Sequence, residues 1–90
     1  MQFVWMGFLK AGEAIDPEMQ EQISQFLQQP FLPIQAAGAL RDEAGARAGY
    51  LVVFEAEHRD AAEALVRESP IRKAGLYSEY HLFEYQNVVG

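Results

Sequence analysis

The segment ESPIRKAGLY (residues 68–77) connects two elements of different kinds. Before it, residues 58–68 carry alanine, leucine and valine at helical spacing, which predicts an amphipathic helix. After it, residues 77–86 are rich in tyrosine and phenylalanine, which favour strands. Pro70 cannot continue the helix, because proline has no backbone N–H and its ring clashes with the preceding turn. We therefore predict a helix, a loop and a final strand.

Three further strands are predicted upstream of this segment. Residues 1–10 and 50–54 are dominated by branched and aromatic residues, as strands are. Residues 33–40 predict a weaker strand, because they contain fewer such residues and a glycine. The polar, glycine-containing residues 41–46 predict the hairpin loop between the two later strands.

Each of the two predicted helices has its own sequence signals. Asp16 and Pro17 predict the start of the first helix, since aspartate caps free N–H groups and proline fits the first turn. Pro30 is expected to end that helix. In the second helix, Glu63 and Arg67 are spaced for an ion pair. The apolar stripes are Met19, Ile23, Phe26 and Leu27 in the first helix, and Ala61, Ala62, Leu65 and Val66 in the second.

The predicted order is β-α-β-β-α-β within one domain, residues 1–90. Right-handed crossovers place both helices on the same face of a four-stranded antiparallel sheet. This is an α+β fold of the ferredoxin-like class.

Both faces of the first strand are apolar, although helices are expected on only one. One face carries Phe3, Trp5 and Leu9, and the other carries Val4, Met6 and Phe8. A large apolar face open to water is a liability for a monomer. We therefore predict a homodimer in which two sheets pack face to face, a dimeric α+β barrel. A core of ninety residues also benefits from burial between subunits.

The composition narrows the function classes. Thirteen acidic residues against seven basic ones give a net charge of −6, which repels nucleic acid. The apolar N-terminal run is too short for a bilayer span and lacks the features of a signal peptide. Cysteine is absent, and His58 and His81 lie far apart in the sequence, so neither a metal site nor a cofactor is expected. We expect a cytoplasmic protein without a nucleic-acid or membrane partner.

From Gly49 onward the chain resembles the YCII-related family, which comprises small dimeric ferredoxin-like proteins. The matching segments are GYLVVFEA (residues 49–56), Ala61-Ala62 and SPIRKAGLY (residues 69–77), and AGAL (residues 37–40) is similar to the second strand of the family. The resemblance implies the same fold and dimer, with a pocket beside the end of the second helix.

The resemblance also implies chemistry that this chain lacks the residues to perform. Family members commonly carry an aspartate before the proline, where this chain has Ser69, and a histidine in the first helix. The predicted helix over residues 16–29 contains no histidine. A carboxylate that orients an imidazole for acid/base work is therefore missing at these positions.

Three functions stay open. The first is binding of a small molecule, aromatic ones included, in a cleft near residues 68–77, without chemistry. The second is a lyase or isomerase that uses acid/base chemistry on a small molecule. The third is a non-enzymatic accessory or interaction domain. Whether the protein is an enzyme is left open by the sequence.

The candidate ligand-binding residues are Ser69, Tyr77, Tyr80 and Trp5. The Ser69 hydroxyl either contacts a ligand or caps a helix end. The aromatic side chains either line a pocket for a planar molecule or fill the core and the dimer interface, and buried tyrosine hydroxyls need a partner in both cases.

The candidate catalytic residues are His81 and Asp42. His81 in the final strand is a possible proton carrier or a histidine satisfied by a neighbouring strand. Asp42, beside Glu43, acts in acid/base chemistry if burial raises its pKa, and otherwise lies at a solvated hairpin tip.

Overall fold

The computed structural model describes residues 1–29 and 33–89. It contains β1 (Gln2–Leu9), α1 (Pro17–Leu27), β2 (Ile34–Arg41), β3 (Arg47–Glu55), α2 (Arg59–Arg67), α3 (Pro70–Lys73) and β4 (Tyr77–Tyr85). The predicted order of strands and helices is confirmed, with the short helix α3 added before the last strand.

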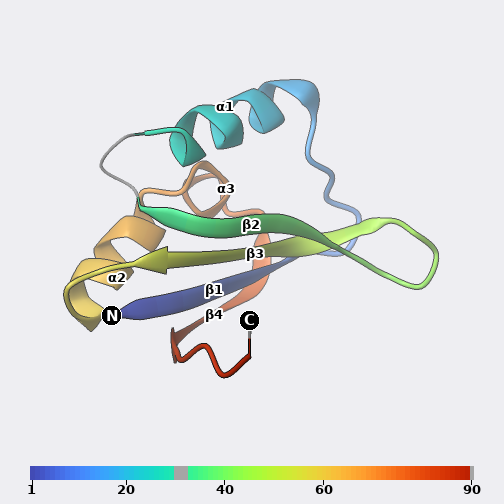
Figure 1. The fold of residues 1–90 in the computed structure, drawn as a ribbon. Coiled ribbons are helices and arrows are strands. Elements are labelled where there is room, and N and C mark those ends of the chain that lie inside the picture. Colours follow the sequence, from blue (N-terminus) through green and yellow to red (C-terminus); the bar gives the residue numbers. More distant parts are fainter. Residues whose placement is uncertain (30–32, 90) are drawn as a thin grey trace.

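The four strands form one antiparallel sheet in the order β2-β3-β1-β4. The two central strands, β1 and β3, lie opposite each other with Trp5 facing Val52, and Leu82 of β4 faces Trp5 from the other side. The helices cover one face of this sheet (Figure 1). The predicted ferredoxin-like α+β fold is confirmed.

The two longer helices begin where side chains cap them. Asp16 Oδ1 accepts a hydrogen bond of 2.7 Å from the Met19 amide, as the aspartate–proline pair predicts. His58 Nδ1 accepts one of 3.2 Å from the Ala61 amide and plays the same role for α2. The last residue of α1 is Leu27, and the predicted stop at Pro30 lies outside the described residues.

Pro70 starts a helix as well as preventing α2 from continuing. Ser69 occupies the N-cap position of α3, Pro70 its first turn, and Gly75 follows with a φ of +71°. Proline suits the first helical turn because its missing N–H would be unpaired there. The left-handed conformation at Gly75 then lets the chain turn into β4. The predicted loop is therefore a single helical turn followed by a glycine turn.

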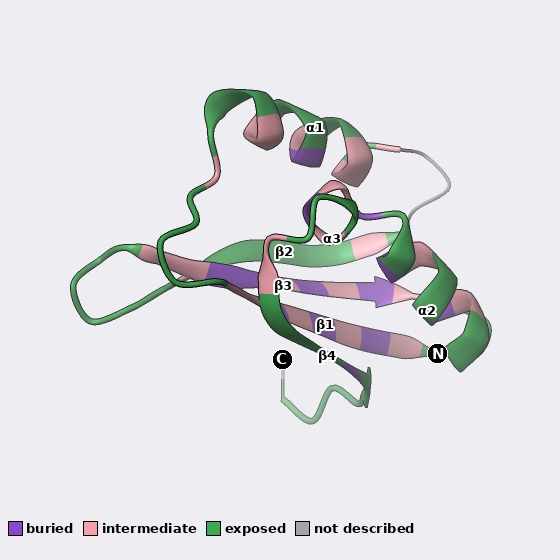
Figure 2. Ribbon diagram, turned by 180° about the vertical axis from the view of Figure 1, so that it is seen from behind, coloured by how far each residue is buried: buried purple, intermediate pink, exposed green. Residues whose placement is uncertain are grey.

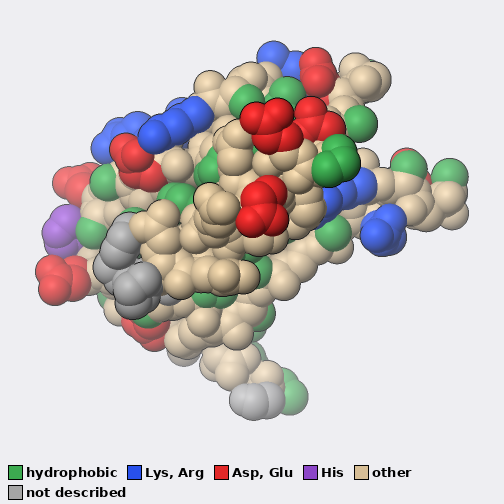
Figure 3. Space-filling view, turned by 90° about the horizontal axis from the view of Figure 1, so that it is seen from above, with side chains coloured by type: hydrophobic (Ala, Val, Ile, Leu, Met, Phe, Trp, Pro, Cys, Tyr) green, Lys and Arg blue, Asp and Glu red, His purple; other side chains and the backbone are tan. Residues whose placement is uncertain are grey.

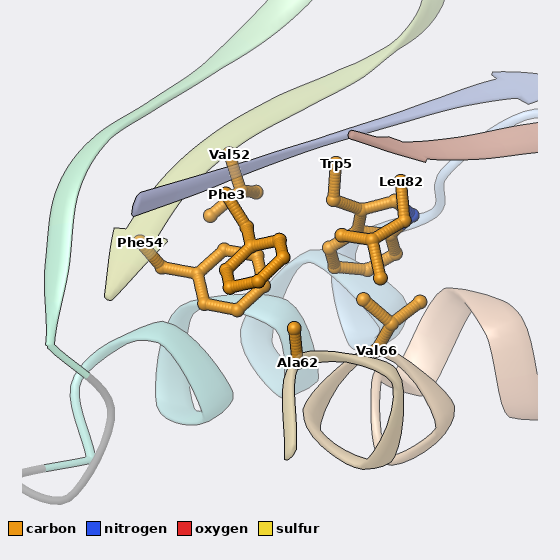
Figure 4. Packing of buried hydrophobic residues seen from close by; sticks show 7 residues of the cluster. All are labelled: Phe3, Trp5, Val52, Phe54, Ala62, Val66 and Leu82. Atoms are coloured by element: carbon orange, nitrogen blue, oxygen red, sulfur yellow. The ribbon is translucent and has the colours of Figure 1, made fainter. Parts of the chain in front are cut away.

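The core lies between the sheet and the helices (Figure 2). Its main cluster consists of Phe3, Trp5, Val52, Phe54, Ala62, Val66 and Leu82. The ring centroids of Phe3 and Phe54 are 6.1 Å apart, and the Trp5 and Leu82 side chains point from the sheet toward Val66 of α2 (Figure 4). A smaller cluster of Ile23, Tyr50 and Ile71 lies under α1 and α3.

The other face of the sheet, which we call the outer face, is also apolar. Because side chains alternate along strands, the outer face carries Val4, Met6, Phe8, Leu51, Val53 and Phe83. None of the helices in the described part of the chain covers these residues, and Phe83 is 51% exposed. The sequence-based view of β1 as a strand with two apolar faces is confirmed.

Candidate functional site

A small cavity lies between α1, α3 and the sheet. Its volume is about 10 Å³, which is about the room that one water molecule needs. Three of the four predicted ligand-binding residues line it, namely Trp5, Ser69 and Tyr77. The remaining wall consists of Ile23, Phe26, Leu27, Tyr50, Val52, Pro70 and Ile71. We call this site the interior cavity.

Two residues that line the interior cavity carry buried polar atoms without partners. Trp5 Nε1 and the Tyr77 hydroxyl are buried, and neither has a hydrogen-bond partner among the described residues. Ser69 is only 3% exposed, and its hydroxyl does not cap α3. It lies close enough to Tyr77 to act on the pKa of that phenol, yet the pair lacks good hydrogen-bond geometry. Because an unsatisfied buried polar group costs about 1–3 kcal/mol, such groups mark a place where a ligand or water is expected.

The Tyr77 phenol is held in its neutral form. Burial raises its pKa well above the ordinary value of 10.0, and the neighbouring Tyr50 raises it further, while Arg47 and Ser69 lower it by smaller amounts. A phenol that stays protonated at physiological pH retains its O–H as a donor. Trp5 Nε1 is also only a donor. Two residues that line the interior cavity therefore each carry an unpartnered N–H or O–H donor.

The raised pKa of Tyr77 predicts a loss of stability in alkali. Between the ordinary tyrosine pKa, 10.0, and the higher folded value, the unfolded chain releases this proton and the folded chain keeps it. Stability is therefore fully present below pH 10 and falls as the pH rises above it. Urea unfolding between pH 8 and 11 is expected to show this decline, with a smaller decline in Tyr77→Phe. Equal declines in both proteins would contradict the assignment.

Local packing fixes the Tyr77 ring. It lies over Gly7 of β1, where a Cβ atom would overlap the ring. Its edge meets the Trp5 ring, with centroids 5.9 Å apart and planes at 82°. The wall of the interior cavity thus depends on a glycine in the central strand.

Arg47 lies beside the interior cavity, against the Tyr50 ring, and no sequence pattern predicts it there. Its guanidinium is 4.3 Å from the centre of the Tyr50 ring, and its Nη1 donates a hydrogen bond of 2.8 Å to Gln20 Oε1. The predicted third strand began at Tyr50, whereas β3 starts at Arg47. Because Arg47 is basic and precedes the apolar run, the sequence pattern assigns it to the polar hairpin loop and not to the strand.

Tyr80 and His81 lie outside the interior cavity, on β4. The Arg72 guanidinium is 4.0 Å from the centre of the Tyr80 ring. His81 Nε2 is 2.8 Å from Glu79 Oε2, and its ring stacks on that of Phe83 with centroids 5.9 Å apart. Both residues border a groove between α2 and β4.

Asp42 lies at the tip of the β2–β3 hairpin. Its Oδ1 accepts hydrogen bonds of 2.9 Å from the amides of Ala44 and Ala46, and the residue is exposed. These bonds order the turn. Asp42 follows β2 and His81 lies in β4, the strands at opposite edges of the sheet, so the fold does not bring the two candidate catalytic residues together.

Two kinds of feature are absent from the described ranges, 1–29 and 33–89. They contain no group of three or more metal-ligating histidine or acidic side chains. None of their helices is both long and apolar enough to cross a bilayer.

Comparison with protein families gives one match, to the YCII-related domain over residues 6–86. No curated protein matches the sequence.

Several solved structures share the fold. 5-Chloro-2-hydroxyhydroquinone dehydrochlorinase from Burkholderia phenoliruptrix AC1100, in complex with 2,5-dihydroxybenzoquinone, has a TM-score of 0.75 at 20% identity, over 98% of this chain and 96% of the enzyme. A hypothetical protein of Pyrococcus horikoshii has a TM-score of 0.55 at 16% identity, over 92% and 87%. SnoaB, a cofactor-independent oxygenase from Streptomyces nogalater, has a TM-score of 0.51 at 18% identity, over 98% and 94%.

Proposed function

This chain belongs to the YCII-related family, and we propose that it binds a small planar, oxygen-bearing molecule in the interior cavity. The observation that carries the proposal is the pair of unpartnered donors, Trp5 Nε1 and the Tyr77 hydroxyl, beside the buried Ser69. The two donors need acceptor oxygens. The aromatic rings around them favour a flat, largely apolar body.

Hydroxylated quinones and phenols have this chemistry. The structural neighbour from Burkholderia is a dehydrochlorinase in complex with 2,5-dihydroxybenzoquinone, a ring that carries carbonyl and hydroxyl oxygens. We use that compound as the probe for this chain.

The interior cavity must widen to admit a ring. Phe26 and Leu27, on the last turn of α1, line both the interior cavity and a second one of similar size toward Phe54 and Leu65. Of the α1 residues, Ile23 is the one classed as buried (Figure 2). Outward movement of the last turn of α1 would join the two cavities above Trp5.

Binding is favoured over catalysis because the interior cavity lacks an acid/base pair. No carboxylate, imidazole or amine is among its described lining residues, and Ser69 stands where the family commonly has a carboxylate. The alternative, a lyase or isomerase that uses His81 or Asp42, stays a prediction and would operate outside this cavity.

The chain contains one tryptophan, so its fluorescence reports directly on the site. Titration with 2,5-dihydroxybenzoquinone is expected to quench Trp5 emission saturably. Tyr77→Phe and Ser69→Ala should each weaken the affinity about 3- to 10-fold, the value of one neutral hydrogen bond.

The matched control is Tyr85→Phe, which removes a phenol from an exposed position on β4. It should leave the affinity unchanged, with free tryptophan as the reference for collisional quenching. Linear, unsaturated quenching that is the same in all four proteins would refute binding in the interior cavity.

We also propose that the protein is a homodimer joined through the outer face, and that it works in the cytoplasm. The apolar side chains of that face support the dimer, because a second sheet would remove them from water. A partner there leaves the interior cavity, on the helical side of the sheet, accessible.

A further inference from the structure

A groove runs between α2 and the edge strand β4, and it shares no lining residue with the interior cavity. We call it the arginine groove, because Arg59, Arg67 and Arg72 line it together with Tyr80, His81 and Phe83. Its volume is about 460 Å³, within the range of about 300–1,000 Å³ that small-molecule sites occupy.

The arginine groove is lined mainly by positive charge, whereas the chain as a whole is negatively charged. Three of the seven basic residues line it in a protein of net charge −6, and Glu63 is the one acidic residue among its described lining. In Figure 3 one group of lysine and arginine side chains lies at the upper left, and others lie at the top and at the right of the molecule. A local positive field in an acidic protein favours an anion there.

Two of the three arginines are free to bind a ligand. The predicted pairing of Glu63 with Arg67 is wrong, since Glu63 Oε1 is 3.5 Å from Arg59 Nε. Within the described part of the chain, Arg67 and Arg72 form no ion pair. Arg72 stacks on the Tyr80 ring at 4.0 Å, which fixes the plane of its guanidinium and leaves N–H groups at its edge.

The third arginine limits the kind of ligand. Arg59 Nη2 donates a hydrogen bond of 2.6 Å to the Leu82 carbonyl, on the open edge of β4. An extended peptide that joined the sheet would need that carbonyl. The edge is therefore partly closed to an added strand, which favours a compact ligand.

We propose that the arginine groove binds a small aromatic carboxylate. Arg67 and Arg72 pair with the carboxylate, since a guanidinium fork matches its two oxygens. The Tyr80 side chain, on the helical side of the β4 wall, contacts the ring. This site is separate from the proposed ligand site in the interior cavity. The side chains of the arginine groove that bind the carboxylate lie on the helical side of the sheet and at its edge. His81 and Phe83, at the rim of the groove, would adjoin a second copy of the chain packed on the outer face.

The test uses benzoate as the probe and benzamide as its neutral match. Amide NMR shifts in the wild-type protein should map benzoate to residues around Arg67, Arg72 and Tyr80, with benzamide at least tenfold weaker. Arg72→Gln and Arg67→Gln should each reduce the benzoate affinity about tenfold or more. Arg72→Lys, which keeps the charge but not the fork, should bind with intermediate affinity.

The control variant is Arg41→Gln, at the hairpin, where the guanidinium donates to the Gly45 carbonyl. It makes the same change in net charge and should leave the affinity unchanged. Tyr77→Phe should also leave it unchanged, which separates this site from the interior cavity. Equal losses in Arg41→Gln and Arg72→Gln, benzamide binding as tight as benzoate, or binding of acidic peptides alone would overturn the proposal.

Discussion

Replacement of Gly49 by alanine is expected to lower the free energy of unfolding by about 3 kcal/mol, the upper part of the usual range for overpacking. Gly49 in β3 lies opposite Phe8 of β1, and a Cβ atom there would overlap the Gly7 carbonyl oxygen. The obstacle is backbone in the two central strands, which cannot turn aside as a side chain can. The total free energy of unfolding of a small domain is roughly 5–15 kcal/mol. Urea unfolding should therefore show a large shift of the midpoint in Gly49→Ala.

Gly38→Ala is the matched control. Gly38 lies in β2, and an added Cβ would meet no atom within 4 Å. Alanine there removes only the extra freedom of glycine in the unfolded chain, so stability should rise by up to about 1 kcal/mol. Equal destabilisation by both variants would show that the close approach of β1 and β3 is not the cause.

Met6→Glu is expected to convert the protein to a monomer. Met6 lies in the central strand between Leu51 and His81, in the middle of the outer face. In a face-to-face dimer the new carboxylate would be buried without a partner, which is strongly unfavourable. The dimer dissociation constant should rise at least about 100-fold, or roughly 3 kcal/mol, as measured by sedimentation velocity from 1 to 100 μM.

Gln22→Glu adds the same charge to an exposed position on α1, on the helical side of the sheet. This variant should sediment as the wild-type dimer does. A wild-type protein that is monomeric throughout the range, or a Met6→Glu variant that still dimerises, would contradict assembly through the outer face.

The sequence was sufficient for the fold because its local signals agree with one another. The branched and aromatic runs of the strands and the apolar stripes in the two longer helices lead to the same β-α-β-β-α-β order. It was not sufficient for α3, because Pro70 gives the same signal when it ends one helix and when it begins the next.

The candidate site was predicted only in part, because a bulge alters which residues share a face. Tyr77 lies opposite Leu9 and Glu79 opposite Phe8, so one extra residue of β4 stands at that point. Tyr77 and Tyr80 consequently both lie on the helical side, with ring centroids 6.5 Å apart. Strict alternation would have placed them on opposite faces. The sequence shows which residues are aromatic, but it does not show that Tyr77 borders the interior cavity while Tyr80 borders the arginine groove.

The most direct test of a ligand in the interior cavity is the ¹H–¹⁵N NMR signal of the Trp5 indole. With one tryptophan in the chain, that signal needs no assignment. If Trp5 Nε1 donates to an oxygen of the hydroxyquinone probe, the indole proton signal should move downfield as the probe is added and then reach a plateau. The Tyr77→Phe variant should need a higher probe concentration to reach the same shift. A probe that binds, as other resonances would show, while the indole signal stays in place would contradict the account.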